Sequence, residues 1–169
     1  MAQVSLRRTR PADLPFVTGL ERHADNRELI GQWSDQEHRE AIGGTTAREH
    51  WIIERDGEPA GYLIAYDGRP RARSLYVKRI LLGEKDRGTG TAALTRYLDE
   101  AFARDGIDYV WLMVRASNAR AQAVYRRLGF ERYEPPSAEA TELAAYAEAP
   151  GAESFRMRLP VSVWRKRAR

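Results

Sequence analysis

The sequence contains no cysteine and no long hydrophobic run. Without cysteine, the chain has neither disulfide bonds nor thiolate ligands for a metal, and a reducing compartment fits this composition. No stretch approaches the roughly 18 apolar residues that a membrane span requires, and residues 1–14 lack the apolar core of a signal peptide. We therefore expect a soluble, cytoplasmic protein without a membrane partner.

Charge gives little indication of a partner. The 28 lysines and arginines against 24 aspartates and glutamates leave a net charge of +4. Part of this excess lies in residues 160–169, which we interpret as a disordered basic tail. No groove-reading motif accompanies the basic residues, so we expect no nucleic-acid partner. The three histidines, His23, His38 and His50, lack the spacing of metal ligands, and we expect no metal.

Hydrophobic periodicity predicts an α/β fold with a mixed sheet. The 169 residues show no repeat and no low-complexity linker, so we expect a single domain over 1–169. In chain order, the expected elements are a strand at 4–7, a helix from 11, a short helix after Ser34 or Asp35, strands at 50–55, 58–66 and 74–82, a helix ending at 105, a strand at 109–114, a helix after 118, a strand at 130–133, one short helix within a loop at 134–153, and a strand at 154–159. An antiparallel meander that leads into a β-α-β crossover has helices on both faces.

Three local patterns support this assignment. Asp56-Gly57 separates two apolar runs, which favours a hairpin because both central positions of such a turn adopt positive φ. The continuous apolar end of the strand at 74–82 predicts burial on both faces. One apolar face, typical of a helix, is formed by Leu94, Tyr97, Leu98, Ala101 and Phe102.

A glycine turn, consisting of Arg87, Gly88, Thr89, Gly90, Thr91 and Ala92, follows the apolar run at 80–82 and opens a helix. Glycine permits a tight turn and a close approach of the backbone to a ligand. The first N–H groups of a helix have no intrahelical partner and, with the helix dipole, attract phosphate oxygens. Arg87 adds a guanidinium that binds phosphate through two hydrogen bonds. On its own, the turn is consistent with an anion site or with an ordinary strand–helix connection.

The segment WLMVRASNARAQAVYRRLGF at 111–130 follows, and its RASNxxAxxxYxxLGF pattern is long and specific. With the R-x-x-G-x-A pattern of the glycine turn, it resembles the GNAT acetyltransferase superfamily. The resemblance covers the whole expected order of elements and is sharpest over 74–133. The motif region is similar to the bacterial ribosomal-protein alanine N-acetyltransferases. The resemblance implies a GNAT-like acyl-CoA N-acyltransferase fold.

The resemblance also implies an activity and a co-substrate. The activity would be acetyl-CoA-dependent transfer of an acetyl group to a primary amine by direct attack on the thioester. Acetyl-CoA would bind between the strand that ends at Leu82 and the strand that ends at Val114, and Asn118 would bond the pantetheine arm as well as cap its helix. Dimers are common in the family, so a homodimer is expected. The remaining implied contacts are main-chain bonds from pantetheine to Ile80, Leu81 and Leu82, and pyrophosphate bonds to Arg87, Gly88, Thr89, Gly90, Thr91 and Ala92.

The resemblance implies that Tyr125 protonates the departing CoA thiolate, since a tyrosine is protonated near neutral pH. Its place on an apolar helix face is also consistent with core packing. The ribosomal-protein enzymes carry a glutamate, their general base, at the position of Met113, and methionine cannot accept a proton. Glu84, Glu54 and His50 are other candidates, and we assign no base. This departure leaves a non-catalytic acyl-CoA-binding or sensing domain as the alternative function.

The acceptor site is implied to lie in residues 22–44 and 134–153. Carboxylates there would attract a cationic amine, whereas the alternative is a capped helix over Trp33 and a solvated loop. The candidate side chains are Trp33, Asp35, Glu37 and His38 in the first segment and Glu139, Glu142, Glu148 and Glu153 in the second. The acceptor is a protein α-amine or a small-molecule amine, and the sequence does not choose between them.

Overall fold

The computed structural model describes residues 1–27, 31–44, 47–69, 71–85 and 87–167. The chain divides into two compact units. The first consists of Met1–Ala65 and Arg79–Tyr97, and the second of Tyr66–Lys78 and Leu98–Arg169. The hydrogen-bonded order of the strands is β1-β2-β3-β4-β5-β7-β6, which confirms the mixed α/β class. The prediction of a single domain stays a prediction.

The strands of the first unit form an antiparallel meander. They are β1 (Val4–Arg8), β2 (Arg48–Arg55), most of β3 (Glu58–Asp67) and the end of β4 (Ser74–Leu82). In the register of β1 and β2, Leu6 lies opposite Ile53. Asp56 and Gly57 join β2 to β3 with φ of 52° and 85°, which confirms the predicted turn.

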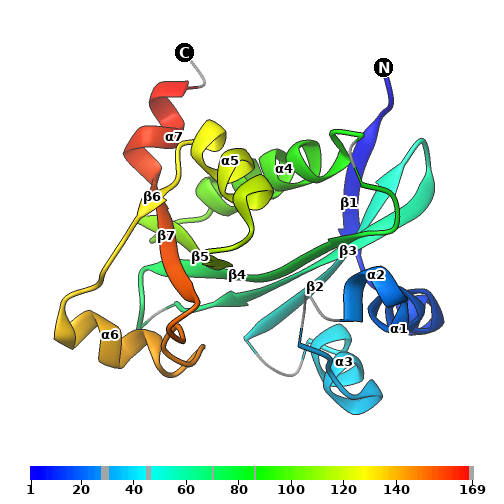
Figure 1. The fold of residues 1–169 in the computed structure, drawn as a ribbon, viewed down its shortest axis with the longest axis horizontal. Coiled ribbons are helices and arrows are strands. Elements are labelled where there is room, and N and C mark those ends of the chain that lie inside the picture. The colour runs from blue at the N-terminus through cyan, green and yellow to red at the C-terminus, as the bar shows by residue number, and fades with distance from the viewer. Residues whose placement is uncertain (28–30, 45–46, 70, 86, 168–169) are drawn as a thin grey trace. The chain divides into compact units, whose positions relative to one another are not determined.

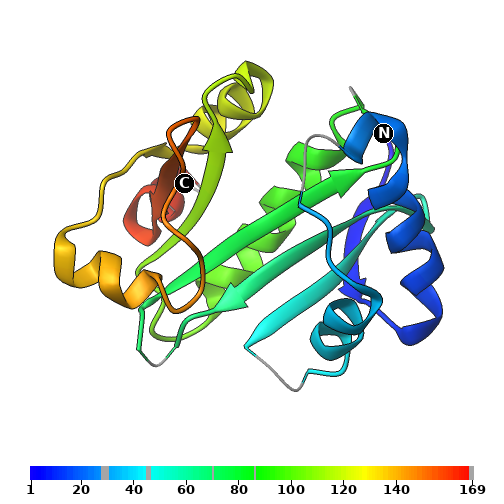
Figure 2. The same ribbon diagram turned by 60° about the horizontal axis from the view of Figure 1, so that its bottom comes forward.

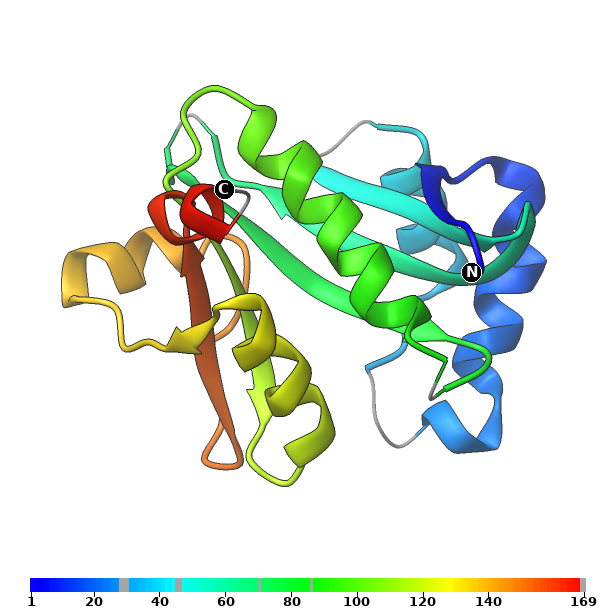
Figure 3. The same cartoon turned by 90° about the horizontal axis from the view of Figure 1, so that it is seen from above.

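Helices lie on both faces of these strands. The 3-10 helix η1 (Pro11–Asp13), α1 (Leu14–Arg22), α2 (Ala24–Arg27) and α3 (Asp35–Ile42) lie on one face, and the first part of α4 (Thr89–Ala103) crosses the other (Figures 1 and 3). Ser34 caps α3: its Oγ accepts from the Glu37 N–H at 3.2 Å, while the Glu37 carboxylate accepts from the Ser34 N–H at 2.7 Å. This capping box decides between Ser34 and Asp35.

In the second unit, β5 (Tyr109–Arg115) has a parallel partner and an antiparallel one. It pairs with β4 over 74–77 and with β7 (Ser154–Pro160) along its whole length (Figure 2). The edge strand β6 (Glu131–Arg132) then pairs with β7, so β7 is inserted between two strands that precede it in the chain. The strand expected at 130–133 is therefore shorter than predicted: Glu131 and Arg132 lie in register with β7, and the Tyr133 N–H adds one further bond to the Arg156 carbonyl at 2.9 Å.

Three further helices complete the second unit: α5 (Ala119–Leu128), α6 (Ser137–Leu143) and α7 (Val161–Arg167). The helix α6 confirms the short helix predicted within 134–153. The helix α7 corrects the prediction of a disordered tail at 160–169, of which residues 168–169 lie outside the described part. Trp164 is buried and donates from Nε1 to the Asp99 carboxylate at 3.1 Å, and Arg167 donates to the Arg127 carbonyl at 2.6 Å. A tryptophan among the basic residues was the sequence signal of a packed helix.

Burial confirms the apolar face predicted for α4, because all five of its predicted side chains are buried. Burial along β4 differs from the prediction. Residues 74–77 are buried in succession, since β5 pairs with them and Tyr76 stacks on Trp111. In the apolar end, Leu81 is buried but Ile80 and Leu82 are half-buried. The end of β4 therefore buries one face rather than two.

Gly61 lets β3 and β4 approach closely. A Cβ there would lie 2.2 Å from the Leu81 carbonyl oxygen and 2.6 Å from a methyl carbon of Leu82. Because the backbone of β4 would have to move, we expect Gly61→Ala to lower the free energy of unfolding by about 1–3 kcal/mol in denaturant titrations. Gly19→Ala is the control, because a Cβ at Gly19 in α1 meets nothing within 4 Å. It should raise the free energy of unfolding by about 0.5–1 kcal/mol, and equal effects of the two changes would contradict this account.

Candidate functional site

The glycine turn lies in the first unit, where β4 leads into α4. The Gly83 N–H donates to the Ala60 carbonyl at 2.9 Å and holds the end of β4 against β3. Gly88 has a φ of +71°, in the region that favours glycine, and α4 begins at the next residue. The Ala92 N–H donates to the Gly88 carbonyl at 3.1 Å. The N–H groups of residues 89–91 precede this bond, so they belong to the first turn of α4.

Two guanidinium groups lie at the glycine turn, one from Arg87 within it and one from Arg55 of β2. Arg87 is exposed and forms an ion pair with Glu84 at 2.9 Å, which is weak because both side chains reach solvent. Arg55 of β2 donates to the Thr89 hydroxyl at 2.9 Å. Beside the turn lies a pocket of about 250 Å³, lined by Phe16, Arg55, Glu58, Pro59, Ala60, Gly83, Glu84 and Thr89. The turn thus combines helix N–H groups with two guanidinium groups, which is an arrangement suited to phosphate.

The other predicted contacts lie on β4 and α5. Ile80, Leu81 and Leu82 follow the residues of β4 that pair with β5. In the second unit, Asn118 caps α5, and its Oδ1 accepts from the Ala121 N–H at 3.1 Å. Tyr125 is half-buried and its ring lies 5.8 Å from that of Phe130. Burial raises the pKa of Tyr125 to about 12, so its hydroxyl is protonated at neutral pH.

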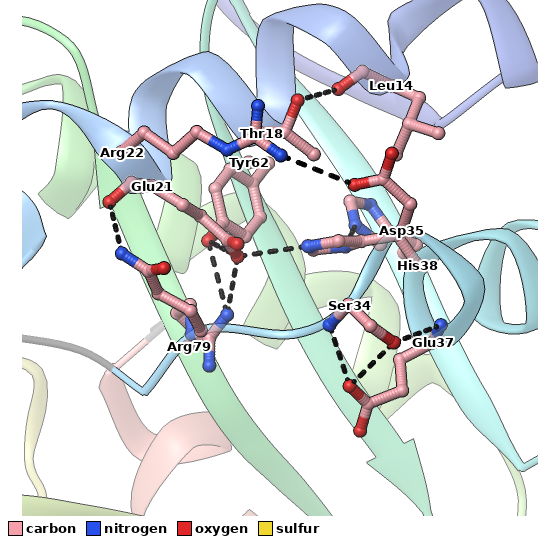
Figure 4. Close-up of polar contacts among 12 residues, drawn as sticks. Leu14, Thr18, Glu21, Arg22, Ser34, Asp35, Glu37, His38, Tyr62 and Arg79 are labelled. Carbon is pink, nitrogen blue, oxygen red and sulfur yellow. Dashed lines mark hydrogen bonds and ion pairs between the residues drawn. The ribbon is translucent and has the colours of Figure 1, made fainter.

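A buried polar cluster in the first unit has Glu21 of α1 at its centre (Figure 4). The Glu21 carboxylate accepts from the Tyr62 hydroxyl and from Arg79 Nη1, each at 2.6 Å, and lies 3.1 Å from His38 Nε2. His38 Nδ1 lies 3.1 Å from His50 Nε2. The opposite charges of Glu21 and Arg79 offset each other in the interior. Desolvation acts against the charged form of Glu21, but its hydrogen bonds and the positive charges around it hold its pKa below the ordinary value.

Sequence reasoning missed this cluster. It joins residues from five separate elements, and only Glu21 carried a local signal. Glu21 falls on the buried face of α1 with Leu14, Val17 and Thr18, and a carboxylate at such a position needs a buried partner. No three His, Cys, Asp or Glu side chains in the described part of the chain are placed to hold a metal ion.

The comparison with known protein families decides the assignment. Residues 19–130 match the model of the acetyltransferase (GNAT) family. The chain belongs to the GNAT family. The mycothiol acetyltransferase of Beutenbergia cavernae is 38% identical over 82 residues, which are 47% of this chain and 27% of that protein. The matched segment therefore spans about a quarter of that relative.

Solved structures with the same fold cover the whole chain. The spermidine N-acetyltransferase of Vibrio cholerae in complex with CoA and spermine is 19% identical, with a TM-score of 0.73 and coverage of 96% of this chain and 98% of that one. The aminoglycoside acetyltransferase AAC(6')-Ib in complex with coenzyme A and kanamycin is 17% identical, with a TM-score of 0.78 and coverage of 99% and 100%. At these identities the likeness establishes the GNAT fold.

Each residue considered as a general base of this GNAT chain already has partners. Glu84 pairs with Arg87, and Glu54 accepts from Arg7 Nε at 2.6 Å. His50 is buried, with its Nδ1 2.8 Å from the Thr9 hydroxyl and its Nε2 facing His38. Both ring nitrogens of His50 are therefore occupied inside the protein, which argues against proton exchange with a substrate.

The candidates for the acceptor site are engaged in different ways. Asp35 forms an exposed ion pair with Arg22 at 3.7 Å, Glu37 completes the capping box and His38 belongs to the buried cluster. Trp33 is half-buried, and its ring forms a T-shaped contact with His38, with ring centroids 5.3 Å apart. In the second segment, Glu139 accepts from the Tyr109 hydroxyl. The other three candidates of that segment are exposed: Glu142, Glu148 and Glu153.

The cluster predicts a pH dependence of stability. Burial, followed by the charge of His38, lowers the pKa of His50 from 6.5 to about 3. The unfolded chain therefore binds a proton in this window that the folded chain does not, so stability falls as the pH drops below about 6.5, by up to about 1.4 kcal/mol per pH unit. Denaturant titrations between about pH 7 and about pH 5 measure this slope. His50→Gln should flatten it, while His23→Gln, at an exposed histidine, should keep it. The same slope in both variants would contradict the assignment.

Proposed function

We propose that this chain is an acetyl-CoA-dependent N-acetyltransferase that moves an acetyl group to a primary amine by direct attack on the thioester. Membership of the GNAT family supports this activity. The curated relative and the structural neighbours are named as acetyltransferases, and both neighbours described above were solved with coenzyme A. The single observation that carries the proposal is the glycine turn, where a positive-φ Gly88 leads directly into the first turn of a long helix.

The chain offers a fitting site for the phosphates of acetyl-CoA. In our proposal, Arg87, Gly88, Thr89, Gly90, Thr91 and Ala92 hold the pyrophosphate. Open space surrounds the Cβ position of Gly88, whereas a Cβ on Gly90 would lie 3.2 Å from a methyl carbon of Leu82. Gly88 thus keeps the approach to the N–H groups free of a side chain, whereas Gly90 allows the start of α4 to lie close to Leu82. The main chain of Ile80, Leu81 and Leu82 and the side chain of Asn118 would hold the pantetheine arm.

The chemistry would require a proton donor for the leaving group. Bound acetyl-CoA supplies the acetyl group as a thioester. Tyr125 remains protonated at neutral pH, because burial raises its pKa to about 12, and in our proposal its hydroxyl donates a proton to the departing thiolate. Main-chain N–H groups at the end of β4 would stabilise the tetrahedral oxyanion. We assign no general base, because Met113 occupies the position where the ribosomal-protein enzymes carry one.

A second function, acyl-CoA binding or sensing without catalysis, is favoured by Met113 alone. Two further proposals concern the setting of the protein. We propose a homodimer in the cytoplasm, although the neighbours include a dodecamer. Among the residues that the structure describes, none of the helices has the length and hydropathy to span a bilayer.

Binding of the donor is tested by thermal unfolding. Acetyl-CoA at a hundredfold excess over its Kd should stabilise the chain by about 2.7 kcal/mol and raise its Tm, whereas acetate or ATP should act far less. Gly90→Glu should abolish the Tm increase, because a carboxylate in the first turn of α4 repels the pyrophosphate. Gly90→Ala is the matched control and should retain most of the increase. No increase in the unmodified chain would exclude both the enzyme and the sensor.

Catalysis is tested by thiol release from acetyl-CoA with a panel of primary amines. Tyr125→Phe should lower kcat by about 10²–10⁴-fold, since it removes the general acid, and should leave the Kd of acetyl-CoA unchanged. Unchanged turnover would remove Tyr125 from the mechanism. If acetyl-CoA binds but no amine releases thiol from the unmodified chain, the non-catalytic function holds instead.

A further inference from the structure

Two arginines of β7 share a face of the second unit with two residues of β5. In the antiparallel register, Arg156 lies opposite Met113 and Arg158 lies opposite Trp111. Directly opposed residues lie on the same side of a sheet, as do residues two apart on one strand. These four side chains therefore lie on one face, and Tyr76 of β4 stacks on Trp111 with ring centroids 4.1 Å apart.

Arg156 is a buried cation without a counter-ion. The residue is 6% exposed, and its Nε is buried and has no hydrogen-bond partner. In the part of the chain that the structure describes, no carboxylate lies within ion-pair distance of Arg156. Its guanidinium carbon lies 5.6 Å from the centroid of the Trp111 ring. A cation–π contact offsets only part of the cost of an unpaired buried charge.

The first unit contains a second buried arginine, Arg79, with which Arg156 can be compared. Arg79 is 7% exposed, nearly as buried as Arg156, but it donates to the Glu21 carboxylate at 2.6 Å. Arg156 has no equivalent of Glu21. The difference points to an anion that comes from outside the protein, because an external carboxylate would satisfy both the charge and the unbonded Nε.

The surroundings of Arg156 favour an anion over a cation. Arg158 adds a second positive charge on this face, with its guanidinium 3.9 Å from the Tyr133 ring centroid. The carboxylate of Glu139 is bonded to the Tyr109 hydroxyl, at the other end of β5 from Met113. Because Met113, directly opposite Arg156, carries no charge, it does not compete with an external anion for the guanidinium. A glutamate in place of Met113 would stand within reach of Arg156 across the two strands.

This face also borders the segment that the family resemblance assigns to the acceptor. Leu143 of α6 belongs to the buried cluster with Tyr76 and Trp111, and Tyr146 packs against that cluster. All of these residues belong to the second unit. An acceptor that lies against residues 134–153 would therefore lie beside the face of β5 and β7 that carries Arg156.

We propose that Arg156 binds a carboxylate of the acceptor, so that the substrate is a primary amine that also carries a carboxylate, such as an amino acid. This inference rests on the N-acetyltransferase function proposed above. The guanidinium would bind the carboxylate through two parallel hydrogen bonds, with Trp111 beside it. Purely cationic amines such as polyamines and aminoglycosides would be poor acceptors, because they would bring positive charge toward Arg156 and Arg158.

The test measures thiol release with matched pairs of acceptors. The probes are L-amino acids, the corresponding L-amino acid amides, spermidine and kanamycin. The unmodified chain should show a kcat/KM at least tenfold higher for at least one amino acid than for its amide, for spermidine and for kanamycin. Arg156→Met should remove this preference through an increase in the KM for the amino acid, with the KM for acetyl-CoA unchanged. Arg156→Lys should retain part of the preference, and Arg158→Met should change it less than Arg156→Met does.

The outcomes separate this inference from the proposed function. Thiol release with amides or polyamines, but without a preference for the carboxylate, would overturn the role of Arg156 and leave the enzyme intact. An increase in the KM for acetyl-CoA in Arg156→Met would assign Arg156 to the phosphates of the donor and overturn the proposal as well. Thiol release with no amine would overturn both. Replacing an unpaired buried charge by an apolar side chain is neutral or stabilising, and Arg156→Gln serves as a second variant if Arg156→Met does not fold.

Discussion

The charge of Glu21 is the constraint on which the first unit depends. A carboxylate that is almost fully buried needs partners, and here they come from Tyr62 on β3, Arg79 on β4 and His38 on α3. None of these partners is a neighbour of Glu21 in the sequence. Satisfying one carboxylate therefore fixes how α1 and α3 pack on the strands. Removing Arg79 would leave the buried charge of Glu21 without its counter-ion, and this costs more free energy than the bond itself contributes.

The glycine turn is positioned by this arrangement. Arg79 is the residue before the apolar end of β4, so its bond to Glu21 holds the strand close to the point where the turn begins. The absence of a side chain at Gly61 allows β3 to lie against the same stretch, and the Gly83 N–H closes it with a bond to Ala60. The N–H groups at the start of α4 thus follow a strand, β4, that is held by α1 through Glu21 and by β3 through Gly61 and Ala60.

The sequence predicted what depends on local pattern. The bounds of β4, the Asp56-Gly57 hairpin, the buried face of α4 and the cap at Asn118 follow from periodicity and turn chemistry, and the structure confirms them. Features that depend on long-range pairing were not predicted. The bond between His38 and His50, the pair of Glu21 with Arg79 and the insertion of β7 between β5 and β6 join residues far apart in the chain. The basic composition of residues 161–167 led to the prediction of a disordered tail, whereas these residues form a helix that Trp164 anchors through its bond to Asp99. The family motif indicated a donor site. That Arg156 is buried, lies opposite Met113 and has an unbonded Nε became visible only from the pairing of β5 with β7.

The opposition of Met113 and Arg156 limits how the proposed activity can change by substitution. In our proposal, one cross-strand pair governs both acid–base chemistry and charge selectivity. A glutamate introduced at position 113 to act as a base would be neutralised by Arg156, and Arg156 would then no longer attract an anionic acceptor. The two properties therefore cannot evolve independently. A route to an enzyme that acetylates cationic amines therefore has to change both strands, because a glutamate at position 113 can act as a base only once Arg156 is replaced.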